Sequence, residues 1–289
     1  ADPLAVLKLL GEAAQADHWR DSGFASDPRL SALAPHAIVF DAYAPVLNTA
    51  PREEGLFEIQ DEGSQLLALL ALWPNLVAPL LGTSPGTVKW KTALPALPAV
   101  PKKPMTVVDA CAGAGGKTLA FADYLGGKGR VYAYDTSEKK LQALRRRGLL
   151  AGYNSIQTAP IAEGKEEEMS TKFAGRADVV LIDAPCSGWG VLRRNPDSKW
   201  KQTRAELDRL PLVQEKLLSS YAKLVRTDGT GRLVYAVCTF RPEETRAVCG
   251  KFLESPIGQE FQAGLGGYLG PGPCDGFFVQ VFDRKAAEK

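Results

Sequence analysis

The pattern of apolar and polar positions becomes regular downstream of Met105. Short apolar runs typical of buried strands alternate there with amphipathic stretches typical of helices. The expected strands are TVVDA, RVYAYD, SIQTAP, DVVLIDAP, RLVYAVCT and FFVQVF, and the expected helices are TLAFADYL, SEKKLQALRRRGLLAG, a segment within residues 203–226 and PEETRAVCGKFLE. Strands that alternate with helices predict a mainly parallel sheet covered on both faces. The predicted fold class is therefore α/β, with a Rossmann-like sheet.

The upstream region has a less regular pattern. Apolar positions at helical spacing predict a helix from Leu4 to Trp19, and AIVFDAYAPV and GLFEIQ have the character of short strands. DEGSQLLALLALW begins with acidic and hydroxyl side chains and continues as an apolar run, which predicts a helix start. Residues 81–104, rich in Pro, Gly, Thr and Lys, are expected to form a surface insertion or linker. We expect an accessory segment over residues 1–57 and a main domain, including that insertion, over residues 58–289.

Composition narrows the class of protein. The 289 residues can form one large domain or one domain with an accessory piece, and the net charge of +2 does not by itself indicate nucleic-acid binding. An apolar span of 18 residues and a secretory leader are both missing from the sequence, so a membrane role is not expected. Five cysteines without a close pair, and only two histidines, indicate a reducing compartment and neither a disulfide framework nor a zinc site. Because the chain begins at Ala1 rather than Met, we expect an upstream segment to have been removed.

A glycine-rich turn between an expected strand and an expected helix is the first candidate site. DACAGAGGKT lets the backbone approach a ligand closely and exposes the N–H groups of a helix N-terminus. Asp135 ends the next strand, 19 residues after Gly116, where a carboxylate can bind both hydroxyls of a ribose. The pattern fits a dinucleotide, S-adenosylmethionine or a structural turn, and we favour a nucleoside-type ligand. GAGGKT lacks the four-residue run of a P-loop before its Gly-Lys pair, so a triphosphate is not expected.

Two cysteines come directly after strands. Cys186 follows VVLIDAP, in which Asp183 ends the strand, and Cys238 follows RLVYAV. Ligands of open parallel sheets lie at the carboxyl ends of the strands. If these two strands are neighbours, two thiols and a carboxylate converge beside the glycine loop. That group suits methylation of cytosine: a thiolate adds to carbon 6, carbon 5 becomes nucleophilic towards a methyl sulfonium, and a carboxyl group near ring nitrogen 3 stabilises the developing charge.

The remaining cysteines and the basic clusters carry weaker signals. Cys111, Cys249 and Cys274 are expected to be small buried side chains. RRNPDSKWK, from Arg193 to Lys201, combines cations with an aromatic ring and suits a phosphate backbone with unstacked bases, although a solvated face is an equally open interpretation. RRR at residues 145–147 is expected to be a solvated helix face.

Taken together, these residues resemble the Nop/Sun family of RNA 5-methylcytosine methyltransferases, particularly the bacterial Sun (Fmu) ribosomal-RNA branch. The matching segments are FEIQDEGSQLLALL, DACAGAGGKT, YAYD, LIDAPCSGWGVLRRNPDSKW, YAVCTFRPEE and DGFF, in family order over about four fifths of the chain. DNA cytosine methyltransferases use a single Pro-Cys nucleophile, so the second cysteine favours RNA. The resemblance implies a class I methyltransferase sheet with a small N-terminal accessory segment.

The resemblance also implies a cofactor and roles for individual residues. The cofactor is S-adenosylmethionine, bound by Ala112, Gly113, Ala114, Gly115, Gly116, Lys117, Asp135 and Asp183. Cys238 is the implied nucleophile, Cys186 the group that assists product release, and Asp183 a contact to cytosine. The expected RNA contacts are Arg193, Arg194, Lys199 and Trp200, and Asp197 and Glu244 fall on motif positions without an assigned role.

The chain departs from the family pattern in three places. IQTAPIAEGKEEE offers only Glu163 as a candidate for the acid that contacts adenine, Val237 replaces a common Thr before the nucleophile, and the segment before Phe57 is short. The adenine contact is therefore the least defined part of the expected site.

We therefore expect methyl transfer to carbon 5 of a cytosine in RNA, with ribosomal RNA favoured over transfer RNA. The protein is expected to be a monomer without a metal, in the cytoplasm, or in an organelle or the nucleus of a eukaryotic source. Two alternatives stay open. An inactive RNA-binding or ribosome-assembly factor could share the fold, and a nicotinamide-dependent dehydrogenase would explain the glycine loop but neither cysteine.

Overall fold

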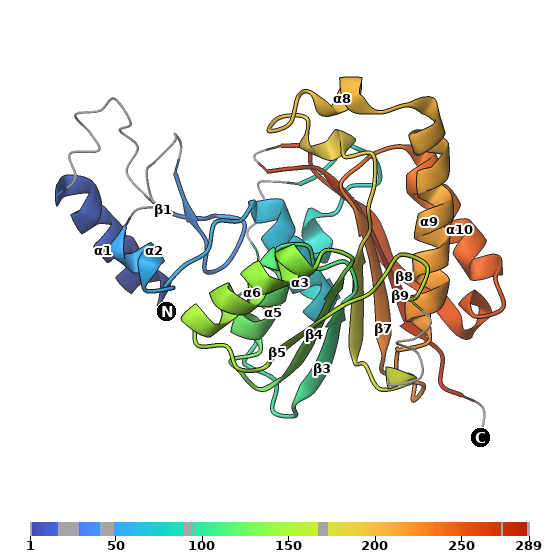
Figure 1. Cartoon of the computed structure of the whole chain (residues 1–289), viewed down its shortest axis with the longest axis horizontal. Coiled ribbons are helices and arrows are strands. Elements are labelled where there is room, and N and C mark those ends of the chain that lie inside the picture. The colour runs from blue at the N-terminus through green and yellow to red at the C-terminus, as the bar shows by residue number, and fades with distance from the viewer. Residues whose placement is uncertain are drawn as a thin grey trace.

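A central sheet of seven strands organises the protein (Figure 1). The computed structural model describes residues 2–16, 29–40, 49–89, 94, 96–166, 173–272 and 274–287. The strands, in sheet order, are β5 (Ile156–Pro160), β4 (Gly129–Asp135), β3 (Met105–Asp109), β6 (Val179–Asp183), β7 (Arg232–Val237), β9 (Phe277–Arg284) and β8 (Phe261–Leu269). The strands β5, β4, β3, β6 and β7 are parallel, and β9 is antiparallel to both of its neighbours. The predicted α/β class with a mainly parallel sheet is confirmed.

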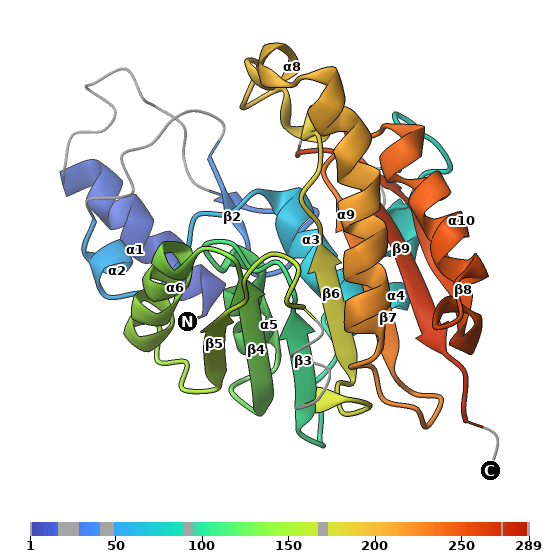
Figure 2. The same ribbon diagram turned by 45° about the vertical axis from the view of Figure 1, so that its right-hand side comes forward.

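Helices cover both faces of this sheet (Figure 2). One face carries α3 (Glu62–Leu72), α4 (Pro74–Val77), α5 (Gly116–Tyr124) and α6 (Glu138–Leu150), and the other carries α9 (Arg204–Ala222) and α10 (Arg246–Glu254). Alternate strand residues enter different cores: Leu181 packs with α3, whereas Ile182 packs with α9 and α10. Burial on both faces explains why the strands appear in the sequence as nearly continuous apolar runs.

The N-terminal elements lie to one side of the sheet in both views (Figures 1 and 2). They are α1 (Pro3–Ala16), the paired strands β1 (Arg29–Leu30) and β2 (Ile38–Val39), and α2 (Ala50–Glu53). Val6 and Leu10 of α1 pack against Phe40 and Phe57. The predicted first helix is confirmed as far as Ala16, and its last three positions lie outside the described residues.

Two upstream expectations about strands need correction. GLFEIQ does not form a strand, because Phe57 packs against the α1 cluster instead of pairing in a sheet. AIVFDAYAPV contributes only Ile38 and Val39 to β2, and residues 41–48 lie outside the described part of the chain. The helix predicted from DEGSQLLALLALW is confirmed as α3, with the Asp61 side chain accepting a hydrogen bond from the Gly63 N–H at its start.

The C-terminal part of the sheet contains a strand that the sequence did not predict. β8 includes Gly264, Gly266 and Gly267, which are poor strand formers, and only pairing with β9 holds them extended. A Cβ at Gly266 would lie 2.2 Å from Oε1 of Gln280, so a larger residue there would displace the Gln280 side chain. The helix predicted over PEETRAVCGKFLE is also divided, into a 3₁₀ turn, η4 (Pro242–Glu244), and α10, because Thr245 leaves the helical conformation (φ −115°, ψ −101°).

The connecting segment over residues 81–104 forms neither helix nor strand in its described portion, where an isolated bridge joins Gly82 to Tyr268. No helix in the described part of the chain has the length and apolar character needed to cross a membrane.

Candidate active site

The glycine loop lies between β3 and α5, at the carboxyl end of the sheet. Gly115 has φ +90°, and a Cβ there would lie 2.2 Å from Cδ1 of Leu144, so the loop requires glycine at this position. Gly113 also has a positive φ (+57°), but a Cβ there would meet no atom within 4 Å. Its N–H donates to Oδ2 of Asp135 at 2.8 Å, and Oδ1 of Asp135 accepts from the Ser137 N–H at 2.9 Å. The structure thus holds the predicted acid against the backbone of the glycine loop.

Lys117, in the first turn of α5, links the glycine loop to β6, the neighbour of β3 in the sheet. Its Nζ donates to Oδ2 of Asp183, at the end of β6, at 2.6 Å, and the two side chains are only 12% and 25% exposed. Burial by itself would lower the pKa of Lys117, but the charge of Asp183 and this hydrogen bond outweigh it and raise the pKa. Because β4 and β6 flank β3 on opposite sides, the ion pair lies where the strand order reverses, which is where open α/β sheets bind ligands.

Asp109 is a second carboxyl group beneath the glycine loop. It is 1% exposed, and its Oδ2 accepts from the Thr118 hydroxyl at 2.7 Å. Burial raises the pKa of Asp109 to about 6, although the hydrogen bond from Thr118 works in the opposite direction. Its other oxygen, Oδ1, is buried without a hydrogen-bond partner among the described residues. An unpartnered buried oxygen beside an open loop is a feature expected of a site that a polar ligand completes.

The two predicted cysteines meet at the ends of neighbouring strands. β6 and β7 are adjacent and parallel, with Asp183 opposite Ala236, so the residues that follow emerge side by side. Sγ of Cys186 and Sγ of Cys238 are 3.3 Å apart, and both thiols are free. The hydrogen bond to Cys238, together with burial, raises the pKa of Cys186. The structure brings the two thiols together as the strand ends predicted, and their chemical roles stay predictions.

The other three cysteines differ in their surroundings. Cys249 and Cys274 are buried, 7% and 1% exposed, as expected for small core side chains. Burial raises the pKa of the Cys249 thiol to about 12. Cys111 is partly buried against the core on the α9 side of the sheet, and burial raises its pKa as well.

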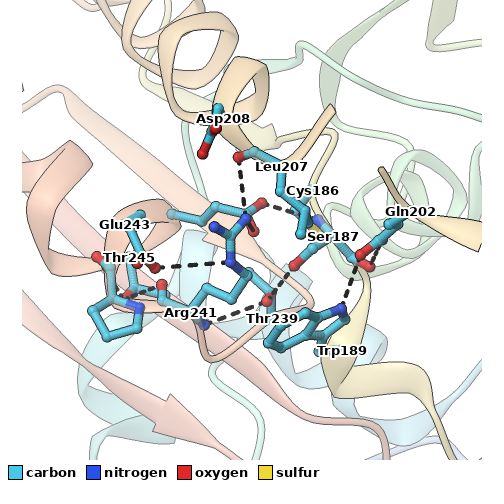
Figure 3. A network of polar contacts seen from close by, with 12 residues as sticks. Cys186, Ser187, Trp189, Gln202, Leu207, Asp208, Thr239, Arg241, Glu243 and Thr245 are labelled. Atoms are coloured by element: carbon cyan, nitrogen blue, oxygen red, sulfur yellow. Dashed lines mark hydrogen bonds and ion pairs between the residues drawn. The ribbon is translucent and has the colours of Figure 1, made fainter. Parts of the chain in front are cut away.

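A polar network that is buried at Ser187, Thr239 and Arg241 and reaches the surface at Trp189 surrounds the Cys186 loop (Figure 3). The Ser187 hydroxyl lies 2.7 Å from the Thr239 hydroxyl, and the guanidinium carbon of Arg241 lies 5.6 Å from the centre of the Trp189 ring. Nε1 of Trp189 donates to Oε1 of Gln202 at 2.9 Å. These contacts join the turns after β6 and β7 to the segment before α9.

Sequence reasoning missed Gln214 and left Glu244 without a role, although both side chains are fully buried in this network. One signal was available for Gln214. Leu210 lies four positions before it and Leu217 three positions after it, so a polar side chain occupies the apolar face of α9. The sequence gave no comparable signal for Glu244, which is one of two adjacent acids, because its burial depends on tertiary contacts.

The predicted RNA-contact residues fall into two groups. Arg194 is held by Asp275, with Nε 3.1 Å and 2.9 Å from the two carboxylate oxygens, and Nη2 of Arg193 is 3.3 Å from Oδ2 of Asp61. Both arginines nevertheless stay about half exposed. Lys199 and Trp200 lie on the short helix α8 (Ser198–Lys201), above the carboxyl ends of the parallel strands (Figure 2). Trp200 is 79% exposed, and Nζ of Lys199 lies 4.9 Å from its ring centre.

Three further charged residues of the sequence analysis have clear positions. Asp197 is exposed and pairs with Lys201, and Glu163 is 70% exposed and pairs with Arg209, so both point to the surface. The expectation that residues 145–147 form a solvated face is wrong for Arg147. This side chain is 18% exposed and donates to Glu58 and, at 2.6 Å, to the Ala114 carbonyl, because α6 packs beside the glycine loop.

The sheet order and the glycine loop after β3 define the class as a Rossmann-like methyltransferase. A model of the family described as 16S rRNA methyltransferase RsmB/F matches residues 97–262, more than half of the chain, and the chain belongs to this family. The predicted membership of the Nop/Sun family, in its bacterial Sun branch, is confirmed. The family also favours a methyltransferase over the dehydrogenase alternative.

Individual relatives agree with this family. The chain is 39% identical over 155 residues to the probable ribosomal RNA small subunit methyltransferase B of Synechocystis sp., covering 53% of this chain and 34% of that protein. It is 28% identical over 264 residues to ribosomal RNA small subunit methyltransferase B of Escherichia coli, covering 87% of this chain and 52% of that protein. The chain thus spans about a third to a half of the length of these relatives.

A solved structure shows the same fold. NSun6 from Pyrococcus horikoshii, solved with SFG, superposes with a TM-score of 0.65 and 19% identity, covering 85% of this chain and 57% of that one.

The site fits the cofactor of this methyltransferase class, S-adenosylmethionine, as predicted. The residues that could hold it are Asp135, whose carboxylate suits a ribose diol, Gly113, which has open space on one side, and Asp109, whose Oδ1 has no hydrogen-bond partner among the described residues. Among the residues that the structure describes, no cluster of three His, Cys, Asp or Glu side chains could hold a metal ion.

Proposed function

We propose that this protein transfers a methyl group from S-adenosylmethionine to carbon 5 of a cytosine in RNA. The observation that carries the proposal is the 3.3 Å separation of the Cys186 and Cys238 thiols at adjacent strand ends. The small-subunit rRNA methyltransferase names of the relatives support ribosomal RNA as the substrate, with transfer RNA as the alternative.

Cys238 is the nucleophile in this proposal. Its thiol gives up a proton to water, the thiolate Sγ forms a bond to carbon 6 of cytosine, and the electron pair of the carbon 5–carbon 6 double bond makes carbon 5 nucleophilic. In this proposal Asp183, whose carboxyl group accepts a hydrogen bond from Lys117 at 2.6 Å, contacts the cytosine at ring nitrogen 3, where a carboxyl group in its protonated form stabilises the charge that the addition creates. Bound S-adenosylmethionine supplies the methyl group.

Cys186 assists the opposite step. After methylation a water molecule acting as base takes the proton from carbon 5, the electron pair of that bond re-forms the carbon 5–carbon 6 double bond, and the bond between Sγ of Cys238 and carbon 6 breaks with its electron pair returning to sulfur. The raised pKa keeps Cys186 protonated at neutral pH, so it can donate a hydrogen bond to the departing Cys238 thiolate.

A denaturing gel tests this division of roles. The purified protein is incubated with RNA transcripts and methyl-labelled S-adenosylmethionine. Cys238→Ala should neither methylate RNA nor form a covalent protein–RNA species, whereas Cys186→Ala should accumulate an adduct to methylated RNA. An adduct with Cys238→Ala instead would exchange the two roles. Binding of RNA without methylation by the parent protein would favour the RNA-binding factor.

Thermal unfolding tests the cofactor site separately. S-adenosylmethionine at 100 times its dissociation constant should stabilise the parent protein by about 2.7 kcal/mol. Asp135→Ala should reduce this stabilisation without unfolding the protein. A nicotinamide dinucleotide should have no effect, and a shift with that ligand alone would contradict the assignment.

A further inference from the structure

Both peptide groups that flank Cys186 are held by buried side chains. The Pro185 carbonyl accepts a hydrogen bond from Nε2 of Gln214 at 2.9 Å, and the Ser187 N–H donates to Oε2 of Glu244 at 2.9 Å. Gln214 also donates to Glu244 at 3.0 Å, and neither side chain is exposed to solvent. Because both partners of the Gln214 amide are acceptors, its nitrogen must face them. The two side chains therefore form a clamp around the peptide groups of Cys186.

The charge of this clamp is balanced by one arginine. Nη1 of Arg241 donates to Oε1 of Glu244 at 3.0 Å, and its side chain is only 10% exposed. Arg241 also donates to the Leu207 carbonyl of α9 and lies against the ring of Trp189, in the Cys186 loop (Figure 3). The carboxylate thus sits between the turn that follows Cys238 and the loop that contains Cys186.

A contribution to folding stability is a weak explanation for the buried ion pair between Arg241 and Glu244. The attraction between two buried charges is largely offset by the loss of their hydration, so a buried ion pair adds little net stability compared with apolar packing. Its location is more informative. The loop after Cys186 contains Gly188 in the left-handed region (φ +70°) and then Gly190, so its own backbone offers little rigidity.

Cys238 is positioned by different contacts. It directly follows β7, which pairs with β6 on one side and β9 on the other. The one backbone contact that it shares with the Cys186 loop is from the Gly190 N–H to its carbonyl at 2.8 Å, whereas the pairing of β7 is independent of that loop. Loss of the clamp should therefore displace Cys186 more than Cys238.

We infer that Glu244 and Gln214 are positioning residues that aim the Cys186 thiol and thereby control product release rather than nucleophilic attack. This inference rests on the proposed function. Neither residue touches the reacting atoms in this role, and each acts through the backbone of Pro185 or Ser187.

The test uses two clamp variants and a matched control. Glu244→Gln removes the charge and leaves an amide N–H₂ facing other donors. Gln214→Met removes the contact to Pro185 without changing any charge. Glu254→Gln makes the same charge change at an exposed acid at the end of α10, away from the clamp. Methylation is measured in single and multiple turnovers, and denaturant-resistant adduct is quantified at steady state.

Both clamp variants should lower multiple-turnover methylation by about 10- to 100-fold, while single-turnover transfer falls much less and adduct accumulates, as with Cys186→Ala. The Glu254→Gln control should match the parent. If Glu244→Gln does not fold, Gln214→Met decides the question. Clamp variants without excess adduct, or with equal losses in both rates, would overturn the inference. If the clamp variants fail in this way but the parent protein methylates RNA and Cys186→Ala accumulates an adduct, the proposed function stands without the inference. If the parent does not methylate RNA and Cys186→Ala forms no adduct, the proposed function and the inference are both wrong.

Discussion

The two halves of the candidate site are held together by different means. The cofactor half, at the ends of β3 and β4, is shaped by backbone conformation: Gly115 needs a left-handed φ, and Asp135 accepts backbone N–H groups. The cysteine half, at the ends of β6 and β7, is shaped by buried side chains, chiefly Gln214 and Glu244. The cofactor half depends on one short stretch of sequence, the glycine loop, and on one further residue, Asp135. The cysteine half depends on residues that three separate segments of the chain bring together.

The largest expected change in stability comes from a substitution in the cofactor half of the site. Gly115→Ala places a Cβ into Leu144 and imposes a left-handed φ on alanine, so it should lower the free energy of unfolding by about 2–5 kcal/mol. Gly113→Ala, also at positive φ but facing open space, should cost only about 1–2 kcal/mol. Urea unfolding of both variants measures the difference. Equal losses would mean that packing against Leu144 does not shape the loop.

The next effect concerns the link between the halves. Lys117→Met leaves the Asp183 carboxylate without its partner in a largely buried position, so it should lower the free energy of unfolding by about 3 kcal/mol. Arg145→Met, which removes an exposed ion pair with Glu138, should cost less than about 1 kcal/mol. Chemical denaturation compares the two variants. A similar loss of unfolding free energy in both variants would mean that burial does not increase the contribution of the Lys117–Asp183 pair to stability.

The next prediction concerns Asp109, which lies beneath the cofactor half, and the quantity measured is the free energy of unfolding as a function of pH. Its folded pKa of about 6 lies above the ordinary value of 3.8, so the folded state binds this proton more tightly than the unfolded state does. Stability should therefore fall as pH rises from about 4 to about 6, by about 2–3 kcal/mol. Asp109→Asn removes this dependence, so it should be more stable than the parent above pH 6 and gain nothing below about pH 4. Parallel stability curves from pH 4 to pH 8 would exclude the effect.

The smallest effect lies outside both halves, on α8. Lys199→Ala should lower RNA affinity a few-fold and reduce the slope of affinity against salt by about one phosphate contact. Arg193→Ala should change the slope less, because Asp61 and Asp275 already lie 3.3 Å and 3.7 Å from its guanidinium. Fluorescence anisotropy with labelled RNA at several salt concentrations measures both slopes. If Lys199→Ala keeps the parent slope, α8 is only a solvated surface.

Local pattern was sufficient for the parallel part of the sheet and for the chemistry-bearing positions. The apolar runs of β3, β4, β6 and β7 are buried on both faces, and each is followed by a turn, so the strand ends and the residues after them could be located from the sequence alone. The glycine loop and Asp135 were recognisable because they need particular residue types at a particular spacing. Cys186 and Cys238 were recognisable for the same reason, as thiols placed directly after strands.

Only the tertiary structure decided what depends on contacts between distant segments. β8 contains three glycines and is a strand only because β9 pairs with it, and GLFEIQ is not a strand because Phe57 packs against α1 instead. The 3.3 Å approach of the two thiols required β6 and β7 to be neighbours, which sequence order does not specify. The burial of Glu244 likewise depends on Arg241 and Gln214 reaching it from two directions. Apolar periodicity reports which face of an element is buried, but the partner that a polar group finds across the core is set only when the elements pack.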